Sequence, residues 1–120
     1  MSGVMVMKPL LNILVIGLLV ATTPARAVGS FNDGNDLLKR CSEPKGAFGG
    51  AYCLGYAAGI ADHMARNRTL DDCIPREVSI GQVRDVIVAR LRNYPEERHF
   101  TAASLAENAL IDAFCPELSQ

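Results

Sequence analysis

Residues 47–66 read AFGGAYCLGYAAGIADHMAR, and this stretch contains no charged side chain between Tyr52 and Ile60. A surface helix carries charges along one face, so an uncharged run of this length predicts a central, well-buried helix. Gly55 and Gly59 lie four residues apart on one face of that helix. Because glycine costs about 1 kcal/mol in a helix interior, we expect the pair to permit the close approach of a neighbouring helix.

A short helix is predicted upstream of this central one, over about residues 35–42. Asn32 or Asp33 can cap it, because a short polar side chain accepts a hydrogen bond from an unpaired amide of the first helical turn. The Ser-Glu-Pro-Lys-Gly run at 42–46 ends it. Its inward residues are expected to be Leu37, Leu38 and Cys41.

Two further helices are predicted downstream. Ser79 followed by Gln82 has the form of a capping box, which starts a helix that ends before Pro95. A fourth helix is expected over about 100–114. The inward positions predicted for the third helix are Ile80, Val83, Ile87, Leu91 and Tyr94, and those for the fourth are Phe100, Ala103, Ala106, Leu110, Ala113 and Phe114. Since short connections imply antiparallel neighbours, the expected fold is all-α, a small four-helix antiparallel bundle.

The N-terminal residues have the pattern of a removable signal peptide. Lys8 precedes an apolar run, and Ala25 and Ala27 supply the small residues that signal peptidase requires. The run is shorter than the about 20 residues that a membrane helix needs. We therefore expect a signal peptide over 1–27 cut after Ala27, a mobile segment over 28–34, a helical domain over 35–116 and a tail over 117–120, with no membrane association after cleavage.

All four cysteines lie after the predicted cleavage point, at Cys41, Cys53, Cys73 and Cys115. A small secreted domain with an even number of cysteines is expected to form disulfides, here in any of three pairings. The antiparallel helix layout favours Cys41–Cys53 and Cys73–Cys115. Because the spacings do not match a zinc or haem motif, no metal and no cofactor is expected.

The charge balance argues against a nucleic-acid partner. Without Lys8 and Arg26 the chain has 10 basic and 13 acidic residues, whereas a phosphate-binding protein concentrates surplus basic residues on one face. Catalysis is also not expected, because the only candidate bases near neutral pH, His63 and His99, lack an identifiable third partner. The protein is therefore predicted to be a non-enzymatic binding module.

The two most polar connections between helices are the candidate protein-binding segments, because loops on a rigid scaffold commonly carry binding residues. Each of these connections supplies four candidate residues. The partner-binding candidates are Arg68, Asp71, Asp72 and Arg76, and Glu96, Glu97, Arg98 and His99.

Several segments, taken in order, resemble one family. They are YCLGYAAGIAD at 52–62, CIPREVSIGQV at 73–83, ARLRNYPEERH at 89–99 and AASLAENALIDAFCP at 102–116. The chain is similar over about residues 34–116 to the Rap/Tai family of periplasmic immunity proteins, which protect bacteria against peptidoglycan amidases injected by type VI secretion. The resemblance implies a disulfide-bonded helical inhibitor, often a homodimer, that inserts a loop into the active site of an amidase.

Two alternatives from other functional classes remain at this point. One is a periplasmic stress or chaperone-like helical protein that binds unfolded clients through exposed apolar surface. The other, weaker one is a small hydrolase with a free cysteine and either His63 or His99. A count of free thiols tests the second, since two complete disulfides leave no nucleophile.

Overall fold

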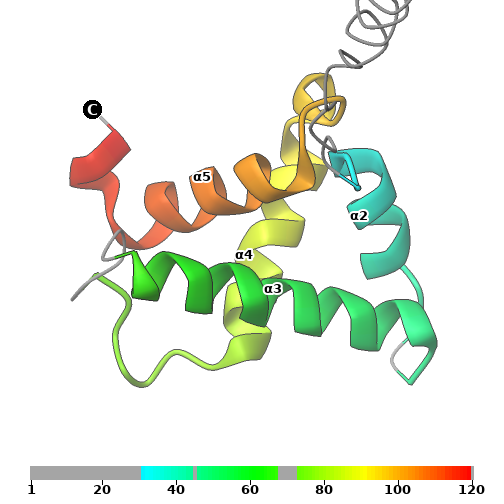
Figure 1. The fold of residues 1–120 in the computed structure, drawn as a ribbon. Coiled ribbons are helices and arrows are strands. Elements are labelled where there is room, and N and C mark those ends of the chain that lie inside the picture. The colour runs from blue at the N-terminus through cyan, green and yellow to red at the C-terminus, as the bar shows by residue number, and fades with distance from the viewer. Residues whose placement is uncertain (1–30, 45, 68–72, 120) are drawn as a thin grey trace, which may run out of the picture.

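The computed structural model describes residues 31–44, 46–67 and 73–119, which form four α-helices and two short 3₁₀ helices (Figure 1). The predicted signal peptide lies outside the described residues, as do Arg68, Asp71 and Asp72. The all-α prediction is confirmed. The elements are α2 (Gly34–Cys41), α3 (Phe48–Arg66), α4 (Ile80–Asn93), η1 (Pro95–Glu97), α5 (Ala102–Phe114) and η2 (Pro116–Ser119).

Capping boxes start two of the helices. At α4, the Ser79 hydroxyl accepts from the Gln82 amide at 3.3 Å, and the Gln82 side chain accepts from the Ser79 amide at 2.7 Å. Asp33 and Asp36 make the same reciprocal pair at the start of α2. The predicted cap of the third helix is therefore confirmed, and Asp33 rather than Asn32 caps the first.

The core is shared by all four helices, each of which contacts the other three. The largest fully buried side chains come one from each helix. In Figure 1, α4 passes across α3 and α5 at a steep angle and so reaches both, while α2 lies against one end of the group. The four side chains are Leu37, Met64, Leu91 and Leu110.

Two disulfides fasten this group of helices. Cys41 at the end of α2 is bonded to Cys53 in α3, with their Cα atoms 5.0 Å apart. Cys73, ahead of α4, is bonded to Cys115 after α5, with Cα atoms 5.3 Å apart. The pairing favoured from the helix layout is therefore confirmed.

The prediction for Gly55 and Gly59 is wrong. Both residues are exposed, and a Cβ built on either would meet no atom of the described chain within 4 Å. The uncharged stretch has an exposed side, because α2, α4 and α5 cover only part of the circumference of α3.

Four residues predicted to face inward are instead exposed, and all lie at or near a helix end. Ile80 is the first residue of α4, and Tyr94 follows its last residue because Pro95 ends the helix. Phe100 precedes α5, whose cap is Thr101, so this helix starts two residues later than predicted. Ala113, in the last turn of α5, is the fourth.

Candidate partner-binding surfaces

The connection between α4 and α5, residues 94–101, presents aromatic side chains to solvent. Tyr94 is 45% exposed and Phe100 is 52% exposed. The imidazole of His99 lies against the Phe100 ring, with ring centroids 4.1 Å apart. Glu96 and His99 are both exposed. Aromatic side chains of this kind are enriched where proteins bind one another.

Two of the predicted binding residues in this connection make contacts within the molecule. The guanidinium of Arg98 donates from Nε to the Leu91 carbonyl at 2.5 Å and from Nη2 to the Arg92 carbonyl at 3.3 Å. These carbonyls belong to the last turn of α4, which has no intrahelical donors for them. Arg98 therefore fixes the connection to the end of α4 through hydrogen bonds that its guanidinium group donates.

Glu97 belongs to a charge cluster centred on Arg90. Arg90 Nη2 lies 2.9 Å from Glu97 Oε2, Arg90 Nη1 pairs with Asp112 of α5, and the guanidinium lies 4.8 Å from the centroid of the Tyr94 ring. Burial alone would lower the Arg90 pKa, but the two carboxylates outweigh it, and the net shift is upward. The cluster joins α4, η1 and α5 around a permanently charged group.

The start of α2 supports the same connection from its other side. The Gly34 amide donates to the Phe100 carbonyl at 3.1 Å, and the Asn35 amide donates to the Arg98 carbonyl at 3.2 Å. The Ala102 amide donates to the Asn32 carbonyl at 3.0 Å. The connection is therefore held at three places, while its aromatic side chains remain exposed.

The other predicted binding segment is only partly described. Arg76 is exposed in the connection between α3 and α4. The structure therefore brings Glu96, Glu97, Arg98 and His99 together in one connection, and of the other four it places only Arg76. Whether these residues contact a partner stays a prediction.

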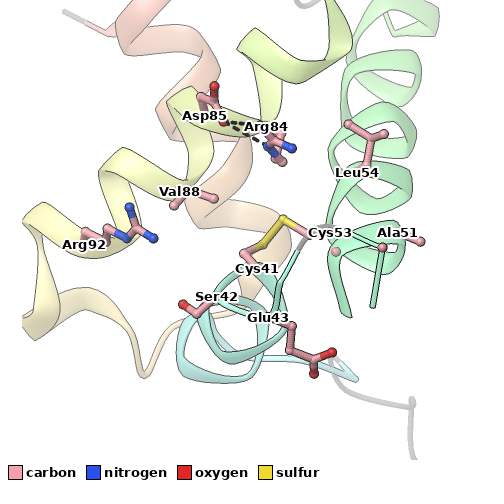
Figure 2. A pocket seen from close by; sticks show the side chains of 12 residues that line it. Cys41, Ser42, Glu43, Ala51, Cys53, Leu54, Arg84, Asp85, Val88 and Arg92 are labelled. Carbon is pink, nitrogen blue, oxygen red and sulfur yellow. Dashed lines mark hydrogen bonds and ion pairs between the residues drawn. A yellow bond between two sulfur atoms is a disulfide. The ribbon is translucent and has the colours of Figure 1, made fainter. Parts of the chain in front are cut away.

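A groove of about 510 Å³ opens between α4 and the α2–α3 junction, and none of the predicted partner-binding residues lines it (Figure 2). The Cys41–Cys53 disulfide, Ser42 and Glu43 line one part of it. Ala51 and Leu54 contribute from α3, and α4 presents Arg84, Asp85, Val88 and Arg92. The volume is within the range of protein pockets that accept several side chains or a small ligand.

The spacing of three α4 residues is the sequence signal that could have indicated part of this groove. Arg84, Val88 and Arg92 follow one another at intervals of four, which places them on one helix face. Apart from Asp85, the remaining lining comes from segments 30 or more residues upstream of Arg84, and their approach to α4 depends on the tertiary fold.

The described residues offer little for catalysis. All four cysteines are in disulfides, so the cysteine-hydrolase alternative lacks its nucleophile. His63 lies with Nε2 2.9 Å from the Asn67 side-chain amide. Within the described ranges no cluster of three or more His, Cys, Asp or Glu is placed to hold a metal ion, and no helix there is long and apolar enough to cross a membrane.

Comparison with known proteins gives one match. The family model described as Rap1a immunity proteins matches residues 33–115. No curated protein and no solved structure matches the chain. The matched region runs from the cap of α2 to the last cysteine, so it includes all four helices and both disulfides.

Proposed function

The chain belongs to the Rap1a immunity protein family, and from this membership we propose that it binds and occludes a peptidoglycan amidase delivered by type VI secretion. We place this action in the periplasm, where the predicted signal peptide would direct the chain. The protein performs no catalysis in this proposal. It protects the cell by covering the active site of the toxin.

The α4–α5 connection is the part of the molecule that we assign to the occlusion. Its backbone is held by Arg98, by the Arg90–Glu97 pair and by hydrogen bonds from Gly34 and Asn35. A segment fixed in advance loses little conformational entropy on binding, so more of the contact energy appears as affinity. The exposed rings of Tyr94 and Phe100 supply apolar surface that a cleft can desolvate.

An inhibition titration tests the proposal. The full chain is expressed with its own N-terminal segment, purified in oxidised form from the periplasm, and added to a peptidoglycan amidase delivered by type VI secretion. We expect peptidoglycan hydrolysis to fall to zero at a fixed molar ratio. An amidase that stays fully active would overturn the proposal. Suppressed aggregation of unrelated proteins would instead support the chaperone-like alternative.

A pair of phenylalanine variants then tests the assigned connection. We expect Phe100→Ala to weaken inhibition by about tenfold or more, since truncating an aromatic anchor commonly costs above 1 kcal/mol. Phe48→Ala is the matched control, because Phe48 is 75% exposed on α3, outside the connection. Equal inhibition by both variants would remove the connection from the binding surface.

Two finer parts of the proposal have tests of their own. N-terminal sequencing of the periplasmic protein should begin at Val28 if cleavage follows Ala27. Sedimentation of the free protein tests the homodimer that the family resemblance implies. A monomeric chain would still be able to occlude an amidase, so this outcome bears only on the assembly.

A further inference from the structure

We propose that the α3–α4 groove is a second contact surface for the same toxin, and that it takes an acidic segment of that protein with carboxylates on both sides of an apolar side chain. The groove is the space lined by α4, the first turns of α3 and the Cys41–Cys53 disulfide. This inference rests on the proposed function, because it names a further part of the toxin-binding surface.

The α4 wall of the groove alternates charged and apolar side chains. Arg84, Val88 and Arg92 occupy one face, and Figure 2 shows all three on the side of α4 toward the groove. Eight residues of helix rise about 12 Å, so the two guanidinium groups flank Val88 by about one helical turn each. A partner segment with carboxylates at a similar separation matches this pattern.

Arg84 is held in a partly desolvated position. Its side chain is only 27% exposed, and it lines a small cavity together with Cys41 and Cys53. Its carboxylate partner Asp85 is 66% exposed, and Arg84 Nε and Nη2 both donate to the single oxygen Oδ1. A guanidinium can accommodate a second carboxylate on its remaining donors, which makes Arg84 an anchor for an acidic side chain.

Arg92 is the arginine of the groove that makes no ion pair with the described residues. Its side chain is exposed, and no carboxylate of the described residues lies within ion-pair distance of it. The two acidic residues of the lining already have partners: Asp85 pairs with Arg84, and the Glu43 carboxylate accepts from the Gly49 amide at 2.8 Å. The formal charges of the lining balance, but Asp85 is paired and the Glu43 carboxylate lies at the positive end of the α3 dipole, so the Arg92 end of the groove attracts negative charge.

The apolar part of the groove is rigid. Val88 is 8% exposed, and Leu54 of α3 is half-buried on the opposite wall. The disulfide joins α2 to α3 at the floor and prevents these elements from separating. An apolar side chain entering between the two arginines would meet a surface that needs no rearrangement, which favours binding.

Association kinetics with the amidase of the inhibition titration test the inference. We expect Arg92→Glu to reduce the association rate constant by about tenfold at low salt and to flatten its dependence on salt, because charges at the edge of an interface steer the encounter. Arg66→Glu is the matched control. Arg66 is exposed in the last turn of α3, as Arg92 is in the last turn of α4, so both variants make the same charge change in the same helical setting.

Arg84→Gln provides a second measurement, since it removes the charge but keeps a polar side chain that can donate hydrogen bonds. We expect the dissociation constant to rise by about tenfold, and circular dichroism of each variant checks that the fold is kept. If wild-type chain binds the amidase and both groove variants behave as Arg66→Glu does, the inference is overturned and the proposed function stands. If wild-type chain does not bind the amidase, both are overturned.

Discussion

Gly34 is a residue at which the structure leaves no space for a side chain. A Cβ there would lie 2.6 Å from Leu105 Cδ1 and 2.9 Å from the Arg98 Cα. The second of these atoms belongs to backbone and cannot move without displacing the α4–α5 connection. The glycine therefore permits the start of α2 to pack directly on that connection.

We expect Gly34→Ala to lower the free energy of unfolding by about 1–3 kcal/mol, the usual cost of adding a group to a well-packed site. Gly55→Ala is the control, because a Cβ there would meet nothing within 4 Å and alanine is the better helix former. It should raise the free energy of unfolding by up to about 1 kcal/mol. Urea unfolding followed by circular dichroism measures both, and destabilisation of the same size in both variants would contradict this account.

Tyr56 makes the stability of the folded protein depend on pH in the alkaline range. Burial raises the pKa of this phenol above 10.0, and the nearby Tyr52 and Glu107 raise it further. The folded state thus favours the protonated phenol. The stability from this preference is complete below about pH 10, where the unfolded phenol is also protonated, and is lost as the pH rises through the folded pKa.

Tyr56→Phe should remove this dependence. We expect its free energy of unfolding to fall less steeply than that of the wild-type chain above about pH 10. Titration of phenolate absorbance in the folded wild-type protein should contain a late component that the variant lacks. A variant with the wild-type pH profile would show that Tyr56 is not responsible for the fall in the free energy of unfolding at alkaline pH.

At the scale of the helices, α3 depends on a residue outside it for its N-terminal cap. Ala47 stands at the cap position and has no side chain that can accept a hydrogen bond. The Glu43 carboxylate instead accepts from the Gly49 amide at 2.8 Å. It satisfies one unpaired amide and places a negative charge at the positive end of the helix dipole.

Glu43→Ala should therefore lower the free energy of unfolding by about 1 kcal/mol, as removal of a helix cap does. Glu43→Gln retains an acceptor and should cost about half as much. Glu77→Ala, which removes an exposed carboxylate from the connection before α4, is the charge-matched control. Chemical unfolding compares the three variants, and a loss in Glu77→Ala equal to that in Glu43→Ala would rule out a capping effect.

The caps also show why some helix starts can be predicted from sequence and others cannot. Ser79 and Gln82 are three residues apart, so their capping box is visible in the sequence and is found in the structure. Glu43 reaches Gly49 across the turn that contains Pro44, and local patterns do not identify such a contact. The apolar spacing predicts Phe100 inside the last helix, whereas the hydroxyl of Thr101 determines where α5 begins.

At the scale of the whole molecule, the fold was more predictable than the binding surfaces. Helix periodicity and the cysteine positions were sufficient for the four helices and both disulfides. The groove could not be predicted, because it forms only when helix packing brings Arg84 of α4 close to Cys41 and Cys53. The sequence marked Glu97 and Arg98 as charged loop residues but could not show that their charges pair within the molecule.

The two disulfides should contribute unequally to the stability of the whole domain. Cys73–Cys115 spans 42 residues and Cys41–Cys53 spans 12. A cross-link stabilises by restricting the unfolded chain, and in the chain-entropy model the longer loop contributes about 1 kcal/mol more. The longer link also joins the segment before α4 to the end of α5, so it holds together parts of the chain that are distant in sequence.

We therefore expect Cys73→Ala with Cys115→Ala to lower the free energy of unfolding by more than Cys41→Ala with Cys53→Ala does. Urea unfolding of the oxidised proteins measures the difference, with extrapolated free energies compared because loss of a cross-link also expands the unfolded state and raises the slope. Since Cys53 and Cys115 are equally buried, at 3% exposed each, the cavities left by the two variants are similar. A larger loss in the Cys41 and Cys53 variant would mean that local packing at the α2–α3 junction, rather than loop length, governs what the cross-links contribute.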